Sequence, residues 1–554
     1  MSRLRGLCLA LLSLGTIGTR SLLADATVTA CVKDVWPGDP RTDLSEALAA
    51  GGTITFACSG TIAFTRSHAL TKNVTIDGGN TITLDGRGNR MFTMGNVFPF
   101  VVFKGIRIVG AAAGPSGLPG SVIVGEGNVA LLDGTTISQS DKPIWVMAGS
   151  LTIQNAAFLQ NNGPVAVVSE GSLDISRFAR FDDNTGQTLA TGPGTQTRIA
   201  DTQFSGNGGS NFGGTTANGC QVTITNSQFF NNVSAEDGGA FTSRCKLTME
   251  KVQFGQNRAA RDGGAVFLGV HSDVTIRALT FNSNQAGRNG GAVADVAALG
   301  QEGALRIASS RFVSNQAGAA GGAIWTGEAG PVVIGGGSFV SNSAATGGGA
   351  VYIRQSPLDI SRSLFFKNKS DNTGGAIESF CMPVNAGRIT NTIIAGNSAG
   401  TGAAFFGSQT TFINTSIVSN GGRPVYHSNR CGDKSIVAFS NTIVEGGFTG
   451  GCAGADASRT FKDLGNNIQF PWWSCGGTIR SVPPVLGLSF APLAPFSPAQ
   501  GAGNTVVCEK SPISGRDIYG AHRPQGPTCS IGAVEGDLTT AYDRAAKGRI
   551  PKRR

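Results

Sequence analysis

The chain has 554 residues, a formal net charge of +9, 81 glycines and only 14% charged residues. Helix formers such as Lys, Glu and Leu are too sparse for a helical repeat, and the basic residues do not follow one face with interleaved aromatics, which argues against a nucleic-acid partner. Such a composition can bury a core, but it requires many tight turns.

Residues 1–26 have the pattern of a secretory signal peptide. Two arginines precede an apolar run, Leu7–Leu14, that is too short to span a membrane, and an A-x-A-type cleavage site ends at Ala26. A lipoprotein box before Cys31 is the weaker interpretation, because Arg20 separates it from the apolar run. We predict a protein that is secreted or lies at the outer cell envelope, including the cell outer membrane, with no transmembrane segment in the mature chain.

Residues 27–72 are expected to form an N-terminal cap and the first coil of a larger structure. Asp43-Leu44-Ser45-Glu46 fits a capping box, and Leu44, Ala47 and Leu48 give the short helix one apolar face. Gly51 can end that helix. Because the open end of a repeat array must be covered, we predict that this helix plugs the N-terminal end.

Residues 73–464 carry an internal repeat, which is clearest over 220–405. In one copy Leu247-x-Met249 is followed by Phe254, Asn257 and a Gly-Gly-Ala turn. Six copies keep this internal spacing, and their starts are separated by 25, 27, 31, 27 and 26 residues because only the stretch after the turn varies. The alternating apolar residues predict a short strand with one buried face, and the Gly-Gly pair allows a turn with positive φ.

Short strands that recur about every 25 residues predict an all-β chain, namely a single right-handed parallel β-helix of the pectin lyase type with about fifteen rungs. Equivalent side chains on successive rungs then lie above one another. The repeated phenylalanines should form an interior stack, and the asparagines should form a hydrogen-bonded ladder. The residues concerned are Phe229, Phe254, Phe281, Phe312, Phe339 and Phe365, with Asn232, Asn257, Asn284, Asn315, Asn342 and Asn368.

Two segments follow the repeats. Residues 465–536 are irregular and rich in proline, and we expect them to cap the C-terminal end. Residues 537–554 form a basic tail that is expected to be disordered.

Ten cysteines remain once Cys8 is removed with the signal, and an even number in an exported chain predicts disulfides. Cys220 and Cys245 are one repeat apart and should face each other on adjacent rungs. Two further pairs are predicted, Cys31 with Cys58 at the N-terminal cap and Cys508 with Cys529 in the C-terminal segment. The sequence leaves open the pairing of Cys381, Cys431, Cys452 and Cys475.

The six F-x-x-N and G-G-A repeats resemble the repeats of the polymorphic outer membrane proteins. The two ends of the chain resemble exported bacterial β-helix proteins with a C-terminal choice-of-anchor Q segment, on Leu464-Gly465-Asn466-Asn467, Arg523-Pro524 and Ile531–Glu535. Ser530 and Gly501 stand where that pattern usually has Asp. The resemblance implies a surface or secreted β-helix and no particular activity.

No catalytic residue is predicted. The paired aspartates, Gly-His-Gly and Arg-x-Lys that resemblance to the galacturonan hydrolases would require do not occur, and the acidic pair Asp182-Asp183 lies at a turn position. Asp237 and Asp262 precede Gly-Gly on adjacent rungs and could hold Ca²⁺. Turn capping, with neighbouring arginines that neutralise the charge, is the favoured interpretation, so no metal or cofactor is predicted.

The strongest candidate site is a column of residues two positions after each Gly-Gly-Ala alanine. By the period of a strand these side chains should point outward, beside loops of variable length. We predict that this edge binds a glycan or a surface protein through Phe267, Trp325, Tyr352 and Glu378, with the three rings as stacking anchors. The competing interpretation is that the loops cover the rings as a satellite core. The full column is Thr242, Phe267, Ala294, Trp325, Tyr352, Glu378 and Phe406.

These observations predict a non-catalytic, monomeric, secreted or cell-surface β-helix that acts in adhesion, glycan binding or envelope and matrix structure. The alternative is a polysaccharide lyase or glycoside hydrolase with an atypical carboxylate site. That alternative is supported only by analogy of fold.

Overall fold

The computed structural model describes most of residues 25–536. The predicted signal peptide up to residue 24 and the basic tail 537–554 lie outside the described residues. Further segments outside them are 36, 39–40, 96, 114–118, 211, 215–219, 270–272, 297–302, 329, 382, 384–385, 430–435, 448–449, 455–459, 488–489 and 491–495.

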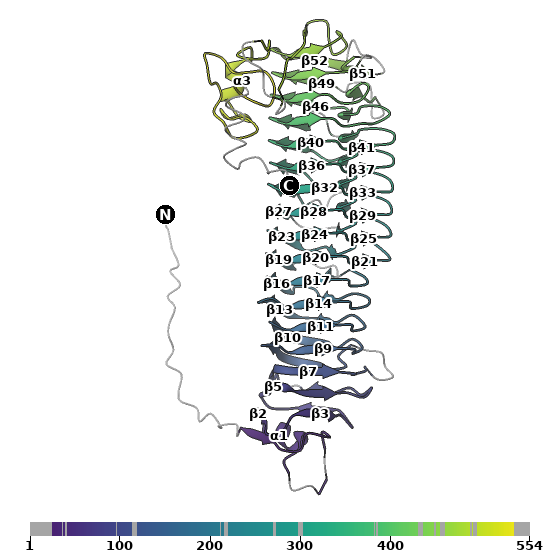
Figure 1. The fold of residues 1–554 in the computed structure, drawn as a ribbon, viewed down its shortest axis with the longest axis vertical. Coiled ribbons are helices and arrows are strands. Elements are labelled where there is room, and N and C mark those ends of the chain that lie inside the picture. Colours follow the sequence, from purple (N-terminus) through teal and green to yellow (C-terminus); the bar gives the residue numbers. More distant parts are fainter. Residues whose placement is uncertain are drawn as a thin grey trace, which may run out of the picture.

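The chain forms one all-β parallel solenoid of about 16 turns, which confirms the predicted parallel β-helix. Figure 1 shows the rungs stacked as a column, with the N-terminal helix at one end and the C-terminal segment beside the other. Each rung contributes strands to three faces of the column, which we call faces 1, 2 and 3, and each strand pairs in parallel with its equivalent on the next rung. Four long strands near the N-terminus, β5, β7, β8 and β10, bend across two faces and join the faces into one sheet.

The strands of face 1 are β1 (Ala26–Val28), β2 (Gly52–Phe56), β5 (Val74–Asp85), β7 (Phe100–Val109), β8 (Ile123–Leu132), β10 (Ile144–Gln154), β13 (Gly171–Ser176), β16 (Gln196–Ala200), β19 (Gln221–Thr225), β23 (Lys246–Glu250), β27 (Val274–Arg277), β31 (Leu305–Ala308), β35 (Val332–Gly335), β39 (Leu358–Ser361), β43 (Gly387–Thr390), β46 (Thr410–Ile413), β49 (Val437–Ser440) and β52 (Phe461–Asp463).

Face 2 consists of parts of β5 and β7 with β3 (Gly60–Ala63), β9 (Thr136–Ser138), β11 (Ala157–Leu159), β14 (Arg180–Asp182), β17 (Gln203–Ser205), β20 (Gln228–Phe230), β24 (Gln253–Gly255), β28 (Thr280–Asn282), β32 (Arg311–Val313), β36 (Ser338–Val340), β40 (Leu364–Phe366), β44 (Ile393–Ala395), β47 (Ser416–Val418), β50 (Ile443–Glu445), β53 (Ile468–Phe470) and β54 (Arg480–Ser481).

Face 3 consists of parts of β8 and β10 with β4 (His68–Leu70), β6 (Phe92–Met94), β12 (Ala166–Val168), β15 (Leu189–Thr191), β18 (Phe212–Gly214), β22 (Phe241–Ser243), β26 (Val266–Leu268), β30 (Val293–Val296), β34 (Ile324–Gly327), β38 (Val351–Arg354), β42 (Ile377–Phe380), β45 (Phe405–Gly407), β48 (Val425–His427) and β51 (Cys452–Gly454). A separate six-stranded sheet at the corner between faces 2 and 3 contains β21 (Val233–Ser234), β25 (Arg258–Ala259), β29 (Gln285–Ala286), β33 (Gln316–Ala317), β37 (Ser343–Ala344) and β41 (Lys369–Ser370).

Face 2 buries the predicted stack of phenylalanines. Consecutive rings lie 4.6–5.0 Å apart between centroids and are nearly parallel, which confirms the predicted interior column. The stack is longer than the six clearest repeats. It contains Phe158, Phe181, Phe204, Phe229, Phe254, Phe281, Phe312, Phe339 and Phe365.

The turn after face 2 contains the predicted asparagine ladder. Each buried side-chain amide donates to the Oδ1 of the next rung's asparagine at 2.9–3.1 Å. The same Nδ2 also donates to a backbone carbonyl on the preceding rung, for example that of Phe254 in the case of Asn284. The ladder runs through Asn161, Asn184, Asn207, Asn232, Asn257, Asn284, Asn315, Asn342, Asn368, Asn397 and Asn420.

The Gly-Gly turn requires its two glycines for different reasons. Gly263 adopts φ +68°, a left-handed conformation that side chains with a Cβ rarely adopt. A Cβ on Gly264 would lie 2.1 Å from the carbonyl oxygen of Gly291 on the next rung. One glycine therefore serves the turn, and the other serves the close contact between rungs.

The N-terminal cap forms as predicted. Helix α1 (Leu44–Ala50) begins after Asp43, which accepts a hydrogen bond from the Glu46 N–H, and it ends at Gly51, with φ +76°. Its apolar residues Leu44, Ala47 and Leu48 are buried against the first rungs. Ala26, the residue before the predicted cleavage point, is the first residue of β1.

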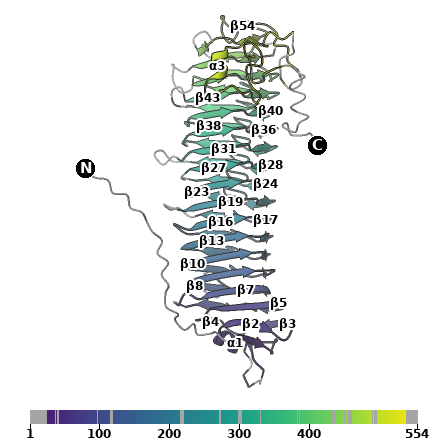
Figure 2. The same cartoon turned by 90° about the vertical axis from the view of Figure 1, so that its left-hand side faces the viewer.

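The C-terminal segment performs two tasks. The solenoid continues past residue 464 into β53 and β54, and the loop between them carries Cys475, which is joined to Cys452. The part from Ser497 to Gly536, which includes α3 (Thr505–Glu509), folds back beside the last rungs rather than over the end (Figures 1 and 2). It packs on apolar side chains that point outward from face 2. These are Ile393, Ala395, Val418, Ile443 and Ile468.

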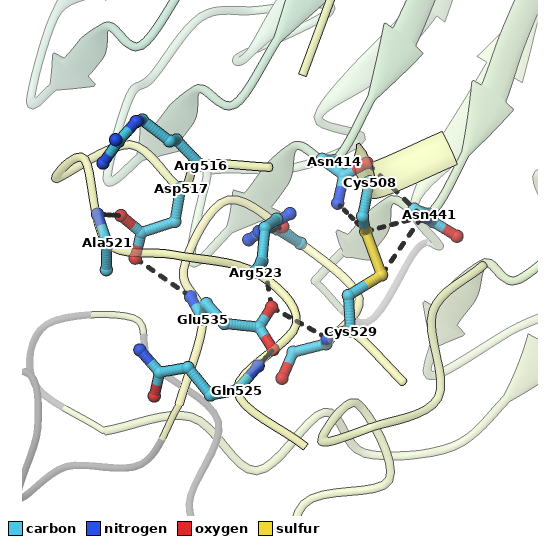
Figure 3. Close-up of polar contacts among 12 residues, drawn as sticks. Asn414, Asn441, Cys508, Arg516, Asp517, Ala521, Arg523, Gln525, Cys529 and Glu535 are labelled. Atoms are coloured by element: carbon cyan, nitrogen blue, oxygen red, sulfur yellow. Dashed lines mark hydrogen bonds and ion pairs between the residues drawn. A yellow bond between two sulfur atoms is a disulfide. The ribbon is translucent and has the colours of Figure 1, made fainter. Parts of the chain in front are cut away.

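Buried polar contacts order this segment internally and also join it to the solenoid (Figure 3). The Arg523 side chain lies 3.3 Å from Glu535, with both side chains almost fully buried, and Asp517 accepts the Glu535 N–H. The Asn441 amide, at the corner between β49 and β50, donates to the backbone carbonyl of Asn504 across the interface. Burial raises the pKa of Glu535, and the Arg523 guanidinium acts in the opposite direction.

The three predicted disulfides are present: Cys31–Cys58, Cys220–Cys245 and Cys508–Cys529. The Cys220–Cys245 bond joins adjacent rungs, because the strands that follow these residues pair in register. Of the four cysteines left open, Cys452 pairs with Cys475 and Cys381 is also disulfide-bonded, whereas Cys431 lies outside the described residues.

Candidate functional site

The predicted outward column lies on face 3. Strand pairing places Phe267 beside Ala294, Trp325 beside Tyr352, and each following member beside the next. The column continues one rung beyond the predicted set to Tyr426, whose ring stacks on Phe406 at 5.2 Å. The predicted alignment of the column is therefore confirmed, and the alternation of apolar residues around Val425 is the sequence signal that places Tyr426 in it.

The side chains of the column differ in how far they are exposed to solvent. Phe267, Trp325 and Tyr352 are half-buried, so part of each side chain is at the surface. Glu378 lies on the outer side of its strand as predicted, in register with Tyr352, but it is only 2% exposed, so the prediction that it contacts a ligand is wrong. The Thr373 hydroxyl donates to its carboxylate at 2.6 Å, and the carboxylate fills the space above Gly347. Glu378 therefore packs within the turn and is not presented to a ligand.

Trp325 and Tyr352 form the part of the column that is best placed for contact. A Cβ on Gly327 would lie 2.4 Å from Cη2 of Trp325, so the absence of a side chain there lets the indole lie flat along its own strand. Tyr352 follows on the next rung in register. Beyond them Arg354 pairs with Glu328 at 3.5 Å, and both are partly exposed. The edge therefore combines two aromatic side chains with an ion pair.

The loops predicted to flank this edge are described only in part. His271, Ser272 and residues 297–302 lie outside the described residues. Asp273 lies on the described side of the first loop and accepts hydrogen bonds from the Ala304 N–H and from Arg306. These bonds hold the pKa of Asp273 below its usual value, so it remains ionised and paired.

The acidic residues considered for chemistry serve turns. Asp237 accepts the Asp262 N–H and pairs with Arg261 at 2.9 Å. Asp262 repeats this arrangement one rung later, with the Asn289 N–H and Arg288. This confirms the interpretation of turn capping with neutralising arginines. In the part of the chain that the structure describes, no three His, Cys, Asp or Glu side chains gather as a metal site.

Asp182 is likewise engaged, since Arg180 donates to its carboxylate at 2.6 Å. Its neighbour Asp183 has φ +54° and lies in the turn before Asn184 of the ladder. Among the described residues, no helix has both the length and the apolar character to cross a membrane.

The fold and this edge define a parallel β-helix protein with an aromatic, partly charged outer edge. No family model matches the chain, and no curated protein matches it. Among solved structures it is similar to the A-module of the mannuronan C-5 epimerase AlgE6 from Azotobacter vinelandii, with 10% identity over 79% of this chain and 94% of that one, and a TM-score of 0.26.

It is also similar to tailspike protein 3 of bacteriophage CBA120, with 13% identity over 79% of this chain and 61% of that one, and a TM-score of 0.27. A third similarity is to the catalytic domain of an α-1,3-glucanase solved with nigerose, with 12% identity over 80% and 63% of the two chains and a TM-score of 0.16. Similarities of this size say nothing about a shared activity.

Proposed function

We propose that this protein is a non-catalytic, exported β-helix that binds glycans through the edge formed by Trp325 and Tyr352. The observation that carries the proposal is the placement of these two half-buried rings on consecutive rungs of face 3, in register and beside the Glu328–Arg354 ion pair. An aromatic ring offers an apolar surface to the C–H face of a sugar, and the charged groups can bind its hydroxyls.

The absence of a catalytic role is part of the proposal. Glycoside hydrolysis requires two carboxyl groups that flank the bond to be cleaved. Two carboxylates at this edge are already engaged, Glu378 by Thr373 within the turn and Glu328 by Arg354. This arrangement supports binding over cleavage.

Export and a monomeric state complete the proposal. The disulfides suit an oxidising compartment, which agrees with the signal-like N-terminus. Helix α1 covers the N-terminal end of the solenoid, which removes one open sheet end at which copies could stack. The resemblances to polymorphic outer membrane protein repeats and to the choice-of-anchor Q segment remain predictions.

The test is a polysaccharide and glycan screen that scores binding and cleavage together. We expect the wild-type chain to bind at least one glycan without releasing reducing ends or unsaturated products. The W325A/Y352A double variant should lose that binding at least tenfold, whereas the W325F/Y352F variant, which keeps both rings, should retain most of it.

Thermal unfolding of the same variants separates the alternatives. If W325A/Y352A binds like the wild type but melts at a lower temperature, the rings are packing residues and the proposal fails. Cleavage products from any polysaccharide would instead favour the lyase or hydrolase.

A further inference from the structure

The corner between faces 1 and 2 in the rung of β13 and β14 contains one residue more than the same corner in the two neighbouring rungs. Phe181 follows Leu173 by eight positions, whereas the corresponding separation is seven in the rungs on either side. Phe181 nevertheless keeps its place in the interior stack, 4.9 Å and 4.7 Å from its neighbours. The additional residue is therefore accommodated entirely at the surface.

The backbone at this corner is strained. Arg177 and Phe178 have φ +56° and +64°, two left-handed residues in succession, while the neighbouring rungs have one such residue at this corner, Asn155 or Asp201. A bulky aromatic residue in this region of φ is a genuine outlier, and outliers of this kind concentrate at functional sites. As a result the Phe178 side chain is 78% exposed.

The exposed ring borders a pocket of about 210 Å³ that extends over three rungs. The pocket lies along β14, β17 and β20 on the part of face 2 that the C-terminal segment leaves uncovered. Its lining residues are Phe178, Ala179, Arg180, Asp201, Thr202, Gln203, Asn226 and Gln228.

Four polar side chains in this pocket are available to a ligand. Within the described chain, the side chains of Asp201, Gln203, Asn226 and Gln228 have no hydrogen-bond or ion-pair partner. Arg180, which also lines the pocket, is instead paired with Asp182. Three amides that both donate and accept, together with one carboxylate, therefore converge beside an exposed ring.

We propose that this pocket binds one neutral hexopyranose unit of a glycan, with Phe178 stacked on the C–H face of the sugar. Side-chain amides match the paired donor and acceptor character of sugar hydroxyls. The unpaired Asp201 carboxylate disfavours uronic acids and other anionic sugars, because like charges would meet. The volume is smaller than the roughly 300–1,000 Å³ of pockets for drug-sized ligands, which suits a single sugar ring.

This site is separate from the edge on face 3 and depends on its own residues. It therefore adds a second contact for a long glycan, or acts alone if the face 3 edge does not bind. The variants below are chosen so that the two sites give different results.

The probes are immobilised neutral oligosaccharides of glucose, galactose, mannose and N-acetylglucosamine, with oligogalacturonate as the acidic counterpart. We expect binding to at least one neutral probe, at least tenfold weaker binding by F178A and by Q203A/Q228A, and nearly unchanged binding by F178W. The matched control is F496A, because Phe496 is also 78% exposed but lies in the C-terminal segment.

Deletion of Phe178 best separates a binding role from a structural role, because it restores the seven-position spacing of the neighbouring rungs. We expect the deletion to abolish binding to the neutral probes while the melting temperature stays the same or rises. A deletion that sharply lowers the melting temperature would show that the corner is structural and would overturn the proposal.

Three further results would also overturn it: no binding to any neutral probe, binding to oligogalacturonate alone, or wild-type binding by F178A. Loss of neutral-probe binding in W325A/Y352A but not in F178A would assign the binding to face 3. That result would overturn this site and leave the proposed function standing.

Discussion

The side-chain amide of Asn284 donates to Oδ1 of Asn315 at 2.9 Å, and both residues are completely buried. Asn284 also donates to the Phe254 carbonyl, and its own Oδ1 accepts from the backbone and the side chain of Asn257. All polar atoms of this amide are therefore satisfied by neighbours on two rungs.

We predict that Asn284→Ala lowers the free energy of unfolding by about 3 kcal/mol, because the substitution leaves buried donors and acceptors on both neighbouring rungs without partners. Asn284→Asp should cost at least as much, since a carboxylate would face the Phe254 and Asn315 oxygens. Chemical denaturation of both variants measures the effect. Loss of less than about 1 kcal/mol in both would contradict a ladder that stabilises the fold.

The phenylalanine stack gives a second prediction. Phe281 is fully buried between Phe254 and Phe312, at 5.0 Å and 4.7 Å. Phe281→Ala should cost about 3–5 kcal/mol through the cavity it leaves. Phe281→Leu should cost less, because it fills most of the space and loses mainly the ring contacts. Equal melting temperatures for Phe281→Ala and F496A, which removes an exposed ring, would be inconsistent with the stack.

The N-terminal cap should be sensitive to acid. Asp34 is buried 2.7 Å from His68 Nε2 and also accepts the N–H and hydroxyl of Thr65. Burial acts to raise the pKa of Asp34, but the hydrogen bonds from His68 and Thr65 outweigh it and hold that pKa below its usual 3.8. The folded state therefore favours the ionised form, which stabilises the cap above pH 3.8 and ceases to do so as the pH falls further.

Asp34→Asn should remove this pH dependence and reduce stability at neutral pH by about 2 kcal/mol, the order expected for hydrogen bonds to a charged group. The measurement is the difference in unfolding free energy between the wild type and Asp34→Asn from pH 6 to pH 2.5. We expect the difference to shrink as the pH falls below 3.8. A difference that stays constant over that range would rule out the role of Asp34.

The buried pair in the C-terminal segment provides the fourth prediction. Arg523→Met leaves the Glu535 carboxylate buried without its counter-charge, which should destabilise the segment by about 3–5 kcal/mol. The double variant Arg523→Met/Glu535→Gln should be less affected than the sum of the single variants, because neither charge is then left alone.

Hydrogen exchange locates this effect. The Ala533 N–H is bonded to Ser416 Oγ on face 2, so its protection reports whether the segment remains docked. We expect protection to fall in Arg523→Met and to recover in part in the double variant. Uniform loss of protection across the solenoid would show that the pair stabilises more than the segment.

The interior of the fold was predictable because its spacing is fixed. Phe254 and Asn257 keep their separation in every clear repeat. In a stacked coil, equivalent residues of successive repeats must then lie directly above one another. Cys452 and Cys475 could have been paired in the same way, since their separation of 23 equals that of Phe158 and Phe181.

The outer surface was less predictable. The period of a strand tells on which side Glu378 lies but not that Thr373 and the turn enclose it. The docking of the C-terminal segment on face 2 had one sequence signal, the change of outward residues from polar ones such as Gln228 to apolar ones such as Ile393 and Val418. The exposure of Phe178 could have been predicted only from the separation of Leu173 and Phe181, which is one residue longer than in the neighbouring rungs.

The extra residue at the Phe178 corner has a consequence for how such a protein can diversify. The rung accommodates one additional amino acid without displacing the interior ring of Phe181, which still stacks on both sides. Single insertions at these corners can thus add new surface groups one at a time, while the scaffold beneath is inherited unaltered. Related chains would then differ in what they recognise by small changes in corner length, and corner length could serve as a design variable for engineering new specificities.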